Sequence, residues 1–126
     1  MPMAEKKKSI LIVEDEEQQR RLLAAAFEKE GYLVHTAEDG ADGLEKAGKL
    51  NPSVIVLDLV MPLGDGVTLL YKINTDPALR STPVVVLTNL AMQDKIKEAM
   101  NVEKDHFFTK TNHSLQEIIS QVKAIA

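Results

Sequence analysis

Short apolar runs alternate with segments of helical periodicity along the chain, and this alternation limits the possible folds more than any other feature. The runs are rich in β-branched residues, which is typical of strands buried on both faces of a sheet. Between the first two runs, Leu22, Leu23, Ala26 and Phe27 recur at helical spacing, and Gly31 lies where a helix should end. The pattern predicts strands at 10–13, 32–36, 54–57, 84–87 and 106–109, and helices at about 16–30, 41–50, from 65 or 66 up to Asp76, at 92–100, and from about 115 onward.

Strict strand–helix alternation predicts an α/β fold with a parallel sheet. Each crossover must be right-handed and must cover one face of the sheet, so helices lie on both faces and the molecule has three layers. A chain of 126 residues with 44% hydrophobic content can bury a substantial core but fits only one domain. We therefore expect a single domain over 1–126, with an ordered core over about 8–125.

Composition excludes several classes of function. A net charge of −4 argues against direct nucleic-acid binding, which depends on Lys and Arg at phosphates. No apolar stretch approaches the roughly 20 residues of a membrane helix, so we expect no membrane association and a cytoplasmic protein. The absence of cysteine excludes disulfides, thiolate chemistry and Cys-based zinc sites, and the three histidines are not at metal-ligand spacing.

Polar side chains follow four of the predicted strands where each strand ends. Glu14 and Asp15 follow the first strand, Asp58 the third, Thr88 the fourth and Lys110 the fifth. The carboxyl ends of parallel strands lie side by side at the crevice where ligands bind. Residues that are remote in sequence should therefore come close in space.

Each residue also has an ordinary structural interpretation. Asp15 with Gln18 could form a capping box at a helix start. Asp58 alone is more often a turn residue, Thr88 a strand-end residue and Lys110 a solvated surface lysine. Their occurrence together at strand ends favours a shared site.

In this order and spacing, Glu14-Asp15, Asp58-Leu59-Val60-Met61-Pro62, Asp65-Gly66, Thr88 and Lys110 resemble the response regulator receiver domains of two-component signalling. The resemblance covers essentially the whole chain. It implies a flavodoxin-like, doubly wound (βα)5 sandwich with strand order 2-1-3-4-5. It also implies that Asp58 is the phosphoacceptor, that Glu14 and Asp15 are the acidic metal pair, and that Thr88 and Lys110 bind the phosphoryl group.

The chemistry of this family requires a cation, because a carboxylate and a phosphoryl group repel each other. Mg²⁺ prefers octahedral oxygen coordination and retains waters, which fits Asp15, Asp58, the backbone carbonyl of Val60, and Glu14 directly or through water; Mn²⁺ is a possible substitute. The product would be a mixed anhydride on Asp58. A shift of Thr88, with Phe107 filling the vacated space, would then switch the face formed by helix 4, strand 5 and helix 5.

The resemblance implies a histidine kinase or histidine phosphotransfer protein as donor, a downstream protein or effector domain as target, and a possible phosphorylation-dependent homodimer. The chain would catalyse its own phosphoryl transfer. We expect slow autodephosphorylation, because the resemblance places the apolar side chains of Val60 and Leu90 beside the approach of water, which they cannot orient and which Asn89 narrows. The alternative is that Asn89 itself positions a water, in which case the phosphoryl group is lost fast.

The chain departs from the family pattern at four places. Thr111 follows Lys110 where a proline in a cis peptide is usual, Asn89 follows Thr88 where a small residue is usual, and Phe107 lacks a tyrosine hydroxyl. Residues 103–104 lack the Gly-Ala that is usual before the fifth strand, so we expect the loop before this strand to differ from that of the family.

Three other classes of protein are alternatives. A pseudo-receiver would share the fold and bind partners without phosphorylation, but it usually lacks part of the acidic, Thr and Lys set. A haloacid-dehalogenase-type phosphatase needs a second Asp where Val60 lies. A flavodoxin needs a hydroxyl-rich phosphate loop where this chain has acidic residues at 14–17.

Overall fold

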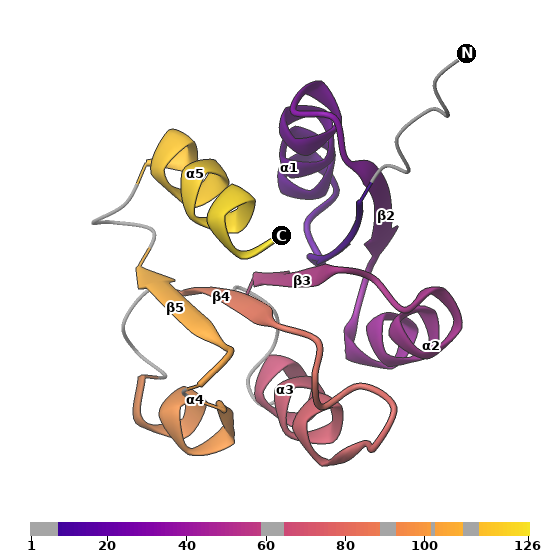
Figure 1. The fold of residues 1–126 in the computed structure, drawn as a ribbon, viewed down its shortest axis with the longest axis vertical. Helices are drawn as coiled ribbons and strands as arrows, with labels where there is room; N and C mark the ends of the chain where they lie inside the picture. The colour runs from indigo at the N-terminus through magenta and orange to yellow at the C-terminus, as the bar shows by residue number, and fades with distance from the viewer. Residues whose placement is uncertain (1–7, 59–64, 89–92, 102, 110–113) are drawn as a thin grey trace.

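The computed structural model describes residues 8–58, 65–88, 93–101, 103–109 and 114–126. They form a five-stranded parallel sheet of order β2-β1-β3-β4-β5, which confirms the predicted doubly wound, flavodoxin-like topology. The strands are β1 (Ser9–Val13), β2 (Leu33–Ala37), β3 (Val54–Asp58), β4 (Val84–Thr88) and β5 (His106–Thr109). As Figure 1 shows, one face of the sheet is covered by α1 (Glu17–Lys29) and α5 (Leu115–Ile125), and the other by α2 (Gly40–Leu50), α3 (Asp65–Thr75) and α4 (Gln93–Ala99).

The side chains of each strand point alternately to the two faces of the sheet, which divides the core into two layers. In β1, Leu11 and Val13 contact the layer that includes Leu69 and Ile73 of α3, whereas Ile10 and Ile12 contact the layer that includes residues of α1 and α5. All four residues are fully buried. Successive side chains of a strand point to opposite faces, so a strand covered on both sides must be apolar at every position. This is why the strands appear in the sequence as continuous apolar runs.

Most element boundaries differ from the sequence predictions by one residue, and at the start of the second strand the structure shows the cause. The second strand begins at Leu33, because the backbone N–H of Tyr32 donates to the Phe27 carbonyl at 3.2 Å and so belongs to the turn after α1. Gly31 lies in this turn with φ of +97°, a conformation that glycine adopts without strain. The alternative interpretation of Asp15 and Gln18 as a capping box is not supported, because the N-cap of α1 is Glu16, which makes no side-chain cap hydrogen bond.

The helices α2 and α5 begin with polar N-caps. The Asp39 carboxylate accepts from the Asp42 backbone N–H at 2.8 Å at the start of α2, and the Ser114 hydroxyl accepts from the Glu117 N–H at 3.2 Å at the start of α5. None of the helices in the described part of the chain is long and apolar enough to span a membrane.

Candidate functional site

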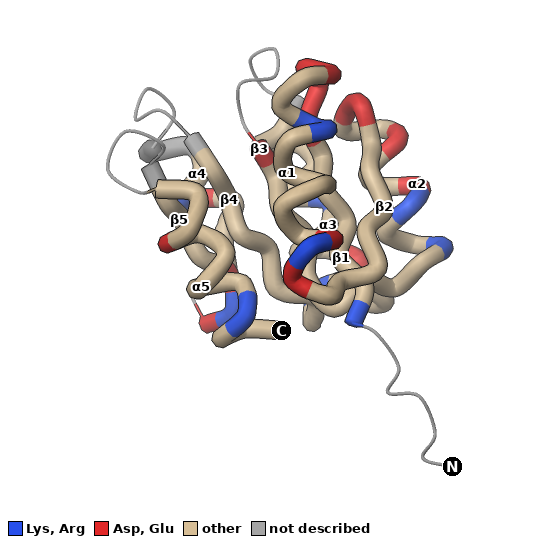
Figure 2. Tube along the Cα trace, turned by 90° about the horizontal axis from the view of Figure 1, so that it is seen from above, with Lys and Arg blue, Asp and Glu red and all other residues tan. Residues whose placement is uncertain are grey.

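The register of the sheet aligns the strand ends that carry the predicted site. Val13 of β1 pairs with Leu57 of β3, so Glu14 and Asp58 follow at neighbouring positions of the same sheet edge. Asp58 pairs with Leu87, which places the backbone of Thr88 one residue further along β4. Figure 2 shows acidic residues gathered at this end of the molecule, around the ends of β1 and β3 and the starts of α1 and α2.

Glu14 and Asp58 are carboxylates with no exposed surface. The backbone N–H of Glu14 donates to the Ala37 carbonyl at 3.0 Å, which extends the pairing of β1 with β2 by one residue. Burial of a carboxylate costs free energy, so two buried carboxylates at adjacent strand ends are typical of a functional site rather than of a core. Asp15, the next residue, is exposed.

Asp58 is one of the residues that line a pocket of about 160 Å³ between α1 and α5. Leu22, Leu23 and Gln19 of α1 form one wall, and Leu115 and Ile118 of α5 form the other. Leu87 of β4 lies beside Asp58 in the lining. A reactant could therefore approach the carboxylate from the face of the sheet covered by α1 and α5.

The structure places only part of the predicted site. It brings Glu14, Asp15 and Asp58 to one edge, with the backbone of Thr88 beside them. The Thr88 side chain, Val60 and Lys110 lie outside the described residues, as do Asn89, Leu90 and the peptide bond between Lys110 and Thr111. Phe107 is half-buried and packs against the core layer that contains Ile96 of α4.

The donor atoms of the described site fit a hard divalent cation. No group of three or more His, Asp or Glu side chains within the described segments is arranged to hold a metal. Mg²⁺, however, usually binds one or two carboxylates and keeps several waters. Carboxylates at 14, 15 and 58, all on one sheet edge, meet that requirement in number and in kind.

The sequence analysis missed one residue next to this site. The Arg20 guanidinium, on α1, donates from Nη1 to the Glu14 carbonyl at 3.0 Å. Its side chain is only 14% exposed, whereas that of the adjacent Arg21 is 79% exposed. The helical spacing contained the signal: Arg20 lies three residues before Leu23 and seven before Phe27, the buried residues of α1, whereas Arg21 does not lie on that face.

Comparison with known proteins agrees with the geometry. Residues 10–123 match the model of the response regulator receiver domain. The chain is 35% identical over 99 residues to the DNA-binding dual master transcriptional regulator RpaA of Synechocystis, which covers 78% of this chain and 40% of RpaA. It is 36% identical over 98 residues to the protein PilG of Pseudomonas aeruginosa, which covers 77% of this chain and 71% of PilG. The chain thus spans less than half the length of RpaA.

Solved structures show the same fold. The chemotaxis protein CheY4 of Vibrio cholerae superposes with a TM-score of 0.82 over 96% of this chain and 100% of CheY4, at 24% identity. The response regulator TrrA of Thermotoga maritima, solved in complex with Mg²⁺ and BeF, superposes with a TM-score of 0.79 over 94% of this chain and 99% of TrrA, at 27% identity. Together with the match over 10–123, these similarities show that the chain belongs to the response regulator receiver domain family.

Proposed function

We propose that this receiver domain accepts a phosphoryl group on Asp58 from a histidine kinase or a histidine phosphotransfer protein, with Mg²⁺ bound. The observation that carries the proposal is the buried Asp58 carboxylate, which follows the strand next to that of Glu14 at the carboxyl edge of the sheet and lines the pocket between α1 and α5. TrrA, a structural neighbour solved with Mg²⁺ and BeF, is further support.

In the proposed reaction, an oxygen of the Asp58 carboxylate attacks the phosphorus of the donor. The P–N bond of the phosphohistidine breaks, and its electron pair stays on the imidazole, which takes up a proton. The product is an acyl phosphate on Asp58. Water later attacks the phosphorus, which releases inorganic phosphate and restores the carboxylate.

Residues of the chain would position the reactants. Glu14 and Asp15 would hold the cation, together with Asp58 and the Val60 carbonyl. The bound cation would neutralise the repulsion between the carboxylate and the phosphoryl group. Lys110 would supply a positive charge, and the Thr88 hydroxyl a hydrogen bond, to the phosphoryl oxygens.

The output would be a shift in the population of two conformations. Movement of Thr88 toward the phosphoryl group would open space for the Phe107 ring, which is half-buried against the layer that includes α4. The face of α4, β5 and α5 would then bind a downstream protein, an effector domain or a second copy of the chain. We also propose that the receiver forms one unit over 1–126 and acts in the cytoplasm.

Intact-mass measurement after incubation with acetyl phosphate and Mg²⁺ tests the proposal. We expect one added phosphoryl group in the wild type, and none in Asp58→Asn or after chelation of the metal. Glu45→Gln, an exposed carboxylate changed in the same way, is the matched control and should be modified like the wild type.

Two results would contradict the proposal. A phosphoryl group that persists in Asp58→Asn would place the acceptor elsewhere. A folded wild type that gains no mass with either the small donor or a phosphorylated histidine protein would support the pseudo-receiver alternative.

A further inference from the structure

Arg20 holds the backbone of the acidic segment that follows β1. Its Nη1 donates to the Glu14 carbonyl at 3.0 Å and approaches the Asp15 carbonyl at 3.5 Å. The first contact is a well-formed hydrogen bond, whereas the second is at the limit of one. The backbone N–H of Arg20 donates to the Glu16 carbonyl at 2.9 Å as the first hydrogen bond of α1, so the guanidinium itself contacts two successive residues of the connection between β1 and α1, Glu14 and Asp15.

The backbone of Glu14 is thereby fixed on both sides. Its N–H donates to the Ala37 carbonyl of β2 at 3.0 Å, and its carbonyl accepts from Arg20. The buried position of the Glu14 side chain and the direction in which Asp15 leaves the strand both depend on these two peptide groups. Because the side chain of Arg20 is only 14% exposed, the contact is poorly accessible to competing water.

The contacts of Arg20 with Glu14 and Asp15 involve their carbonyl oxygens, so the guanidinium acts on this segment through its backbone. Its one ion-pair contact among the described residues is with the exposed carboxylate of Glu38, at 3.9 Å. A planar guanidinium presents several donors in a fixed geometry and can bind several oxygens at once, which the ammonium of lysine does less well. Arg20 is therefore suited to fix a loop that must present carboxylates in one direction.

We propose that Arg20 is a positioning residue for the divalent cation: it holds the 14–16 segment in the conformation in which Glu14 and Asp15 bind Mg²⁺. The proposal rests on the proposed function and deepens it. Residues that orient metal ligands without touching the metal commonly change metal affinity by about 10- to 100-fold when they are removed.

Whether removal of Arg20 weakens or strengthens Mg²⁺ binding distinguishes a positioning role from a purely electrostatic one. A positive charge near a cation site repels the cation, so its removal by itself should strengthen Mg²⁺ binding. Loss of the loop conformation should instead weaken binding. We expect Arg20→Ala to raise the Kd for Mg²⁺ by at least about tenfold, in spite of the lost repulsion.

Calorimetric titration of the unphosphorylated, full chain with MgCl₂ is the experiment, with Arg20→Ala, Arg20→Lys and Arg21→Ala compared with the wild type. Arg21→Ala is the matched control, since Arg21 is exposed and pairs only with Glu17 at 2.7 Å among its described contacts. It should leave the Kd unchanged. Arg20→Lys keeps the charge but not the guanidinium, so its Kd for Mg²⁺ should lie between the values of the wild type and Arg20→Ala.

Amide hydrogen exchange without metal provides a second, independent measurement. The amide of Glu14, which donates to the Ala37 carbonyl, should exchange faster in Arg20→Ala than in Arg21→Ala, while the amides of β3 remain protected in both. Protection in β3 also shows that the variant is folded. Unchanged exchange at Glu14 would overturn the positioning role.

The outcomes distinguish this proposal from the proposed function. If the wild type binds Mg²⁺ and Arg20→Ala binds it equally well or more tightly, only the role of Arg20 is wrong. If the wild type binds no Mg²⁺, the metal-dependent function itself is wrong, and the role of Arg20 in cation binding with it.

Discussion

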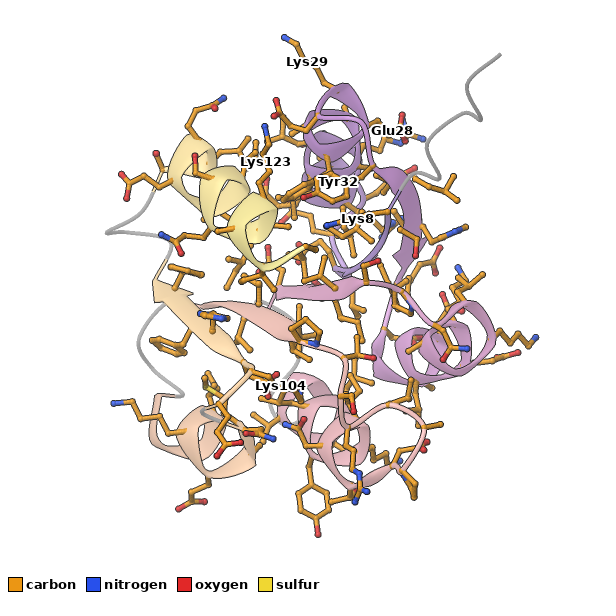
Figure 3. All side chains as sticks on the ribbon, in the orientation of Figure 1. Lys8, Glu28, Lys29, Tyr32, Lys104 and Lys123 are labelled. Carbon is orange, nitrogen blue, oxygen red and sulfur yellow. The ribbon has the colours of Figure 1, made fainter. Side chains whose placement is uncertain are left out.

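The buried carboxylate of Asp105 accepts hydrogen bonds from four other residues. It lies at the start of β5, at the opposite end of the sheet from Asp58, and its side chain has no exposed surface. It accepts from the backbone N–H groups of Val84 and Asn101 and from Asn74 Nδ2, each at 2.9 Å, and from the ammonium of Lys104. Lys104 lies on the side of the sheet covered by α3 and α4 (Figure 3). One side chain thus ties α3, β4 and the connection after α4 together.

Asp105→Ala should therefore destabilise the fold by about 3 kcal/mol or more, because it removes the negative charge that pairs with the partly buried Lys104 ammonium and leaves two backbone donors without their acceptor. Asp105→Asn keeps the shape and one acceptor oxygen, so it should cost less. Glu103→Ala, an exposed neighbour, is the control. Urea unfolding measures all three; a loss in Asp105→Ala no larger than in Glu103→Ala would contradict the role of the network.

Tyr32 is a second residue whose environment has a measurable consequence. Its ring is buried between α1 and α5, packs edge-on against Phe27 with centroids 5.8 Å apart, and has Lys123 nearby (Figure 3). Burial raises the pKa of the phenol above its usual value of 10.0, and the positive charge of Lys123 opposes the shift only in part. The unfolded chain therefore loses this proton at a lower pH than the folded protein does.

Stability that depends on Tyr32 should accordingly be complete below pH 10.0 and be lost as the pH rises from there toward the folded pKa. The chain has two tyrosines, so in Tyr71→Phe the ultraviolet absorbance of tyrosinate reports on Tyr32 alone. Titration of this variant, folded and in urea, should give a higher pKa in the folded protein. Identical values in the two states would show that burial does not perturb the phenol.

At the scale of elements, α2 approaches β1 closely at one glycine. A Cβ added at Gly43 would lie 2.9 Å from Val13 Cγ2 and 3.1 Å from Leu69 Cδ2, both in the fully packed layer on that face of the sheet. Val13 is β-branched and directly precedes Glu14, so it has little freedom to move away. The same helix contains Gly48, where an added Cβ would meet nothing within 4 Å.

The two glycines should therefore respond oppositely to the same substitution. Gly43→Ala should destabilise the protein by about 1–3 kcal/mol through overpacking. Gly48→Ala should stabilise it by about 0.5–1 kcal/mol, because alanine favours the helix. Thermal or urea unfolding of the pair measures the difference. Equal effects of the two changes would mean that α2 does not pack against Val13 as closely as the structure shows.

These elements also show what a sequence can predict. The buried strands were located to within one residue, because strands covered on both faces must be apolar throughout. The start of β2 was misplaced because a turn hydrogen bond from Tyr32 carries no sequence signal. The sequence does not predict the close approach of α2 to β1 at Gly43 either, since a glycine in a helix pattern does not show which residue packs against it. Strand ends predicted that Glu14 and Asp58 follow neighbouring strands at one edge of the sheet, whereas the contact of Arg20 with the Glu14 carbonyl required coordinates.

At the scale of the whole molecule, one sheet is shared by both core layers. Val13 and Ile12 are neighbours in β1, yet they belong to opposite layers, so neither layer can lose its packing without exposing the strands of the other. A small domain of this kind should unfold in one cooperative transition. Any ligand that binds only the folded state then stabilises the entire domain, and not only the edge of the sheet to which it binds.

Mg²⁺ should be such a ligand, because Glu14, Asp15 and Asp58 come together only when β1 and β3 pair. Magnesium at about a hundredfold excess over its Kd should add about 2.7 kcal/mol to the free energy of unfolding and raise the midpoint of thermal unfolding by several degrees. Asp15→Asn should reduce this increase. KCl at the same ionic strength is the control, because any salt screens the repulsion between the carboxylates of this edge without binding to them specifically. A midpoint that rises equally in KCl and in MgCl₂, or equally in Asp15→Asn and the wild type, would show that the carboxylates at this edge do not bind the cation.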